Sequence, residues 1–159
     1  MNRLFYPVVL LLIGMACVPS AFARDENNTS AGLTAVGAPL GLHGSDPVAL
    51  VNGKRINGIA SHTATEGGIA YYFANQRNLD AFKKSPQRYV PQNGGFCTFG
   101  VSVGKKFDGD PRYSSVQDGK LFLFLNEDIF KEFQKDRSGT IAKATANWSR
   151  IEHLAASAL

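Results

Sequence analysis

The chain is poor in sulfur and in metal-binding side chains. It contains two cysteines, two methionines and three histidines in 159 residues. Because Cys17 lies in a leader that we expect to be removed, the mature protein keeps Cys97 alone and can form no internal disulfide. A disulfide scaffold and a cysteine-rich zinc module are therefore excluded, and stability must come from a packed core.

Long hydrophobic runs are absent after the first residues. Arg3 precedes the apolar stretch Leu4–Met15, and Ala21-Phe22-Ala23 supplies the small residues of a signal peptidase site. The run is shorter than the ~20 residues that a stable membrane anchor needs. We expect residues 1–23 to be a signal peptide, which predicts a periplasmic or secreted protein without a transmembrane anchor after cleavage. Lipidation of Cys17 and an uncleaved anchor are the alternatives.

Concentrated charge is also lacking. The net charge is +4, but the basic residues come as scattered pairs, at Lys54-Arg55, Lys83-Lys84 and Lys105-Lys106. Nucleic-acid binders gather such residues on one face or carry a recognisable motif, so we expect no nucleic-acid partner. Weak attraction to anionic lipid or polysaccharide remains open, and the partner is not identified. No internal repeat stands out in the sequence.

The organisation of the mature chain begins with a polar segment. Residues 24–41 are predicted to be a flexible leader, followed by a domain over 42–151 and a tail over 152–159. Val48–Val51, followed by Asn52-Gly53, predicts a strand that turns into a hairpin. Ile69–Phe73 predicts a second strand, and Asn75 is a good N-cap for the amphipathic helix after it.

The second part of the domain contains similar turn and helix-capping signals. Asp118-Gly119 predicts a hairpin turn into Lys120–Leu125, which is apolar on both faces. Asn126 is predicted to cap another helix that Ser138-Gly139 ends, with Thr140 as the candidate cap of a further helix. The Asp108–Arg112 segment reads as a loop. These patterns predict an α+β fold, a small antiparallel sheet of hairpins with several helices packed on it.

Four segments in this order resemble the YHS domain family, in its secreted, cysteine-poor branch. They are LHGSDPVAL, the block from YYFANQRNLDAF to GGFCTFG, DGKLFLFLN and IAKATANW. The resemblance covers 42–151 and implies a small module that is often associated with metal. In the metal-associated branch, cysteines stand at the positions of Ala49, Ala74 and Asn78. The resemblance therefore implies the scaffold without its thiolate cluster.

The remaining soft or borderline metal ligands in the domain are His43, His62 and Cys97. They could form an open copper or zinc site if the fold brought them together. The resemblance also places His62 near the family's namesake histidine. The leading hypothesis is an exported binding or accessory domain with weak metal or metal-cofactor binding through these three residues.

Several other functions remain open. One is a metal-free module that binds protein or lipid. Another is an enzyme with a Cys97 nucleophile and a His62 base, which is disfavoured because no nucleophile motif accompanies the cysteine. Asp108 and Asp110 could bind a hard cation, although their loop reads as an ordinary turn. Finally, most of the aromatic residues should lie in the core, but a few of them could line a pocket for a small apolar ligand near Cys97. The candidates are Tyr71, Tyr72, Phe73, Phe82, Tyr89, Phe96, Phe99 and Trp148.

Overall fold

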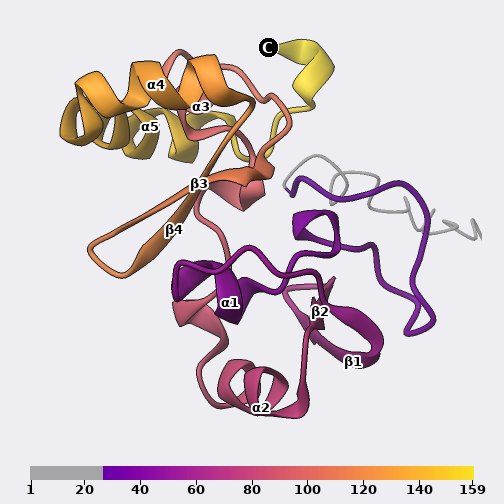
Figure 1. The fold of residues 1–159 in the computed structure, drawn as a ribbon. Coiled ribbons are helices and arrows are strands. Elements are labelled where there is room, and N and C mark those ends of the chain that lie inside the picture. Colours follow the sequence, from indigo (N-terminus) through magenta and orange to yellow (C-terminus); the bar gives the residue numbers. More distant parts are fainter. Residues whose placement is uncertain (1–26) are drawn as a thin grey trace, which may run out of the picture.

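The computed structural model describes residues 27–159 and consists of two similar halves, each a hairpin with helices (Figure 1). Within this part of the chain there are two antiparallel sheets of two strands each, which confirms the predicted α+β class. Figure 1 shows α1, α2, β1 and β2 below α3, α4 and α5, with the β3–β4 hairpin between them. The predicted signal peptide and Cys17 lie outside the described residues.

The order of elements is the same in both halves. The first half contains the 3₁₀ turn η2 (Leu42–Gly44), α1 (Pro47–Val51), β1 (Ile59–Glu66), β2 (Ile69–Phe73), α2 (Gln76–Lys84) and η3 (Pro86–Arg88). The second contains η4 (Asn93–Gly95), α3 (Thr98–Ser102), β3 (Asp110–Gln117), β4 (Lys120–Phe124), α4 (Glu127–Lys135), α5 (Arg137–Ile151) and η5 (Ala156–Ala158).

The two halves are an internal repeat, with equivalent residues 51 positions apart. The bounds of η2, α1, β1, β2 and α2 map without insertion onto those of η4, α3, β3, β4 and α4. Both hairpins carry an irregularity at the same place, between Ile59 and Thr63 in β1 and between Asp110 and Ser114 in β3. The backbone repeats as well, since Gly44 and Gly95 both have a φ of 80°. The expectation of no internal repeat is therefore wrong.

Asparagine caps begin the corresponding helices α2 and α4, as predicted. The Asn75 side chain accepts the N–H of Asn78, and the Asn126 side chain accepts the N–H of Ile129. Each cap satisfies a backbone donor that the first turn leaves without a helical partner, and each helix then runs for nine residues.

The predicted strand at Val48–Val51 is wrong, because these residues form the helix α1. Asp46 caps this helix by accepting the N–H groups of Val48 and Ala49, and Pro47 occupies its first turn. This cap outweighs the β propensity of the two valines. Gly53, with a φ of 75°, then follows the C-cap, so Asn52-Gly53 ends a helix and does not turn a hairpin.

Two further boundaries differ from the predictions. The helix α4 ends at Lys135, and α5 begins at Arg137 because Asp136 caps it by accepting the N–H of Gly139. The predicted loop at Asp108–Arg112 contains the start of β3 at Asp110.

The core is built from equivalent aromatic pairs. Phe73 and Phe82 lie 4.9 Å apart in the first half, and their counterparts Phe124 and Phe133 lie 4.2 Å apart in the second. All four side chains are almost fully buried, and truncation of a buried phenylalanine costs about 3–5 kcal/mol. Leu121 and Leu123 of β4 join the core of the first half, which ties the two halves together.

Residues 27–41, part of the segment predicted to be a flexible leader, lie against the domain. Thr29 pairs with Gly41, and Leu40 forms a parallel bridge with Ala70 of β2. The backbone N–H of Asn28 also donates to the carbonyl of Gly94. In residues 27–159, no helix is sufficiently long and apolar to cross a membrane.

Candidate functional site

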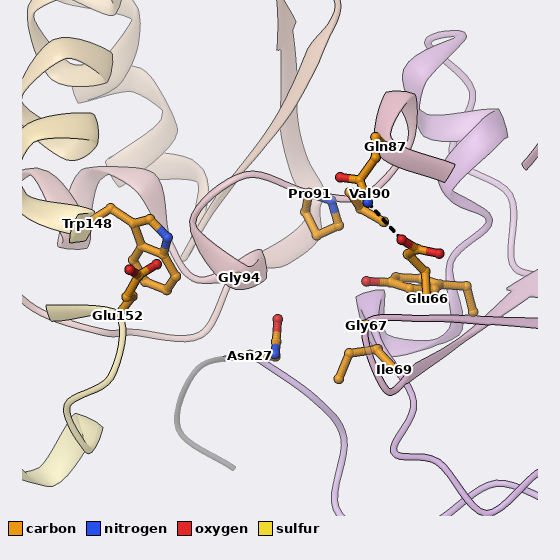
Figure 2. A pocket seen from close by; sticks show the side chains of 11 residues that line it. Asn27, Glu66, Gly67, Ile69, Gln87, Val90, Pro91, Gly94, Trp148 and Glu152 are labelled. Atoms are coloured by element: carbon orange, nitrogen blue, oxygen red, sulfur yellow. Dashed lines mark hydrogen bonds between the residues drawn. The ribbon is translucent and has the colours of Figure 1, made fainter. Parts of the chain in front are cut away.

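A pocket of about 280 Å³ lies at the junction of the two halves (Figure 2). The β1–β2 hairpin forms one wall, and the end of α5 forms the opposite wall. The segment between the halves lies between these walls, and Asn27 also lines the pocket. This volume suits a small molecule. The lining residues are Asn27, Glu66, Gly67, Ile69, Tyr71, Gln87, Val90, Pro91, Gly94, Trp148 and Glu152.

The pocket is acidic although the protein is basic. Glu66 and Glu152 lie on opposite walls, and the lining contains no lysine, arginine or histidine (Figure 2). Oε1 of Glu66 accepts a 2.7 Å hydrogen bond from Gln87, which orients this carboxylate. Oε1 of Glu152 lies 3.3 Å from Nε2 of His153. Two carboxylates without a basic residue in the lining favour a cationic ligand.

Tyr71 brings a buried polar group to the same pocket. Tyr71 is only 5% exposed and lines the pocket. Burial, and secondarily the charge of Glu66, raises the pKa of this phenol, so Tyr71 stays protonated at neutral pH. A protonated phenol can donate a hydrogen bond to a polar ligand in the pocket or accept one from it.

Lys106 fixes the wall formed by the end of α5. It is 6% exposed, and its Nζ donates to the carbonyls of Glu152 at 2.9 Å and of Leu154 at 2.7 Å. The same ammonium lies 5.2 Å and 5.4 Å from the ring centroids of Phe96 and Trp148. These contacts satisfy a buried charge and hold Trp148 and Glu152 in place.

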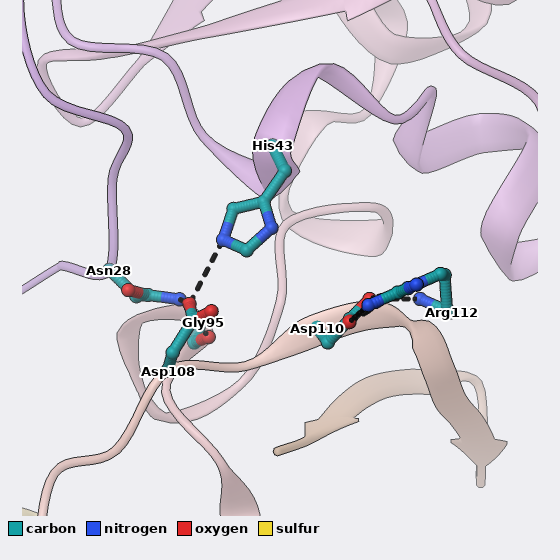
Figure 3. Close-up of polar contacts among 6 residues, drawn as sticks. All are labelled: Asn28, His43, Gly95, Asp108, Asp110 and Arg112. Atoms are coloured by element: carbon teal, nitrogen blue, oxygen red, sulfur yellow. Dashed lines mark hydrogen bonds and ion pairs between the residues drawn. The ribbon is translucent and has the colours of Figure 1, made fainter. Parts of the chain in front are cut away.

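Of the three predicted metal ligands, His43 contacts an acidic residue on the surface (Figure 3). Its Nε2 lies 2.9 Å from Oδ1 of Asp108, which also accepts a 2.7 Å hydrogen bond from Asn28. The pair joins η2 of the first half to the segment before β3. Asp110 is separate from it, since its carboxylate is bound by Arg112.

The other two predicted ligands lie elsewhere. His62 is in the irregular part of β1, with a buried Nδ1 that has no hydrogen-bond partner within the described part of the chain. Cys97 is buried at the start of α3, where Sγ accepts the N–H of Gly100 at 3.4 Å. Burial raises the pKa of this thiol, although nearby N–H groups act against that effect. Across residues 27–159, no three His, Cys, Asp or Glu side chains are grouped to hold a metal, so His43, His62 and Cys97 do not form one site.

The three positions at which the resemblance implies missing cysteines all surround Asp46. Oδ1 of this fully buried carboxylate accepts the N–H of Ala49, and also that of Val48. Its Oδ2 accepts the N–H of Ala74 and the side-chain amide of Asn78. The four donors satisfy the buried charge, so this cluster stabilises the fold.

The sequence did not identify Glu66 and Glu152 as members of one site. They are far apart in the chain, one at the end of β1 and the other just after α5, and the fold brings both to the lining of one pocket. Of the aromatic residues considered for an apolar pocket, Tyr71 and Trp148 line this one. The pocket is nevertheless polar, and Cys97 does not line it.

Comparison with known proteins gives no match, whether to a family model, to a curated protein or to a solved structure. The resemblance to the YHS domain family therefore stays a prediction.

Proposed function

We propose that the protein is a binding module that takes a small organic diamine in the pocket between its two halves. The observation that carries this proposal is the lining, in which Glu66 and Glu152 lie on opposite walls and no lysine, arginine or histidine is present. Two separated carboxylates match two separated ammonium groups better than one.

The other lining groups fit the same ligand. The Tyr71 hydroxyl can accept an N–H of the ammonium group beside Glu66. Ile69, Val90 and Pro91 offer an apolar surface for the methylene chain between the two charges. Charge-assisted hydrogen bonds in a partly desolvated pocket are roughly twice as strong as neutral ones.

The proposal keeps the protein in the class of exported binding domains that the leader and the resemblance suggest. Ala49, Ala74 and Asn78 converge on Asp46, so the positions of the implied thiolate cluster serve the fold in this chain. Copper or zinc binding through His43, His62 and Cys97 has no comparable support, because these residues are not grouped.

Trp148 makes a direct test possible because it is the only tryptophan in the chain and lines the pocket. Titration with 1,4-diaminobutane should change its fluorescence in a saturable manner. Butylamine, a monocation of similar length, should bind at least about tenfold more weakly, a difference of about 1.4 kcal/mol. The affinity for the diamine should fall as salt is added.

Charge-neutralising variants identify the groups that bind. Glu66→Gln and Glu152→Gln should each weaken diamine binding by about tenfold or more, and the double variant should lose the preference for diamine over butylamine. Glu132→Gln, which removes an exposed carboxylate on α4, is the matched control and should bind as the wild type does. Diamine binding that both pocket variants retain would refute the assignment, as would a folded wild type without any diamine response.

A further inference from the structure

The second half contains a pocket at the position equivalent to that of the first. This pocket, of about 590 Å³, lies between the β3–β4 turn and the start of α5. Five of its lining residues correspond to lining residues of the first pocket, 51 positions earlier in the chain. The pairs are Glu66 with Gln117, Gly67 with Asp118, Gln87 with Ser138, Val90 with Ile141 and Pro91 with Ala142.

The repeat therefore creates two hollows from one backbone arrangement. In each, a hairpin turn faces the segment that follows a nine-residue helix. The coincidence is not a consequence of sequence similarity, because none of the five pairs is identical.

The chemistry of the second pocket differs from that of the first. Glu66 is replaced by the neutral Gln117, and the lining now contains both signs of charge. Arg137 and Asp118 have no ion pair or side-chain hydrogen bond among the described residues, so both groups are free to bind. Ile141 and Ala142 add an apolar surface beside them.

We infer that this second pocket binds the zwitterion of an aliphatic amino acid. The Arg137 guanidinium matches a carboxylate, which it can bind through two parallel hydrogen bonds. The Asp118 carboxylate matches the α-ammonium group, and Ile141 and Ala142 would contact the aliphatic side chain. A diamine would meet Arg137 with like charge, so the two pockets select different ligands.

The test uses L-leucine and two analogues that each lack one charge, with the full chain studied by calorimetry. N-acetyl-leucine lacks the ammonium group, and leucinamide lacks the carboxylate. Leucine should bind at least about tenfold more tightly than either analogue. Trp148 fluorescence should not change, because Trp148 lines only the first of these two pockets.

Two exposed substitutions assign the charges. Arg137→Gln should weaken leucine binding about tenfold and leave leucinamide binding unchanged. Asp118→Asn should weaken leucine binding similarly and leave N-acetyl-leucine binding unchanged; asparagine also tolerates the positive φ of 49° at this position. The Glu66→Gln/Glu152→Gln double variant should bind leucine normally, which separates this inference from the diamine proposal. Absence of saturable leucine binding, or binding that neither Arg137→Gln nor Asp118→Asn weakens, would overturn it.

Discussion

The two halves carry different side chains at one equivalent backbone position, the carboxylate of Asp46 in the first half and the thiol of Cys97 in the second. Each residue precedes a short helix and has its backbone N–H bound to a carbonyl ten residues later, that of Ile56 or Phe107. The Asp46 carboxylate accepts four hydrogen bonds. Around the Cys97 thiol, the N–H groups of Phe99, Gly100 and Leu125 are the equivalents of three of these donors.

The fourth hydrogen-bond donor to Asp46 has no equivalent in the second half, where the acceptor is a thiol. Asn78, which donates its side-chain amide to Asp46, corresponds to the apolar Ile129 in the second half. A buried charge needs full hydrogen bonding, whereas a neutral thiol does not. The same backbone arrangement therefore accommodates either a carboxylate or a thiol at its centre. The buried carboxylate, however, needs all four hydrogen-bond donors.

The largest expected effect comes from removing the two central side chains. Asp46→Ala leaves four donors without an acceptor, and we expect a loss of about 3–5 kcal/mol in the free energy of unfolding. Cys97→Ala should cost about 1–2 kcal/mol, because it removes only weak acceptor contacts and a small volume. Urea unfolding of both variants measures the difference, and equal losses would break the proposed asymmetry.

A second prediction concerns Gly58 and Gly109, which are equivalent and identical. A Cβ on Gly58 would overlap the backbone of Tyr72, and one on Gly109 would overlap the Gly95 carbonyl. Each Gly→Ala change should therefore cost about 2–3 kcal/mol in thermal unfolding. The control is Gly53→Ala, which meets no atom and should cost only about 1–2 kcal/mol for its positive φ. If both substitutions left the stability unchanged, neither close approach would constrain the fold.

Arg55 and Lys106 occupy equivalent positions in the two halves but differ in burial. Arg55 is exposed, whereas Lys106 is buried and donates to two carbonyls at the end of α5. Lys106→Met should lower the free energy of unfolding by about 2–3 kcal/mol, since it leaves these carbonyls unsatisfied. Arg55→Met should stay within about 0.5 kcal/mol of the wild type. Similar values for the two variants would contradict the role assigned to Lys106.

The smallest expected effect tests the similarity of the halves. Asn75→Ala and Asn126→Ala each remove an N-cap with the same geometry, so each should cost about 1 kcal/mol. Chemical denaturation of both variants checks this. A difference larger than about 1 kcal/mol would show that the two helices depend on their caps to unequal extents.

The elements that the sequence predicted correctly depend on local contacts. The caps Asn75 and Asn126 bond within their own first turn, and the Asp118-Gly119 turn depends on its own backbone conformation. The helix α1 was missed because Asp46-Pro47 reads equally well as a turn or as a capped first turn. Only the structure shows that the carboxylate accepts the two N–H groups.

The repeat and the pocket could not be predicted for a different reason. The equivalent positions that stay identical are few, such as Gly58 with Gly109, Phe73 with Phe124 and Asn75 with Asn126. They preserve backbone geometry and core packing, while the surrounding residues diverge. Glu66 and Glu152 line the same pocket from distant parts of the chain, and no local pattern encodes that arrangement.

We propose that the junction of the two halves is a diamine site built around Glu66, Glu152, Tyr71 and Trp148. The most direct measurement is a titration of ¹⁵N-labelled protein with 1,4-diaminobutane, observed at the indole N–H of Trp148. We predict a saturable shift of this resonance in the wild type. In the Glu66→Gln/Glu152→Gln variant, the affinity for the diamine should be at least about tenfold weaker. An indole resonance that stays in place at saturating diamine, or a shift with equal affinity in the double variant, would contradict the account.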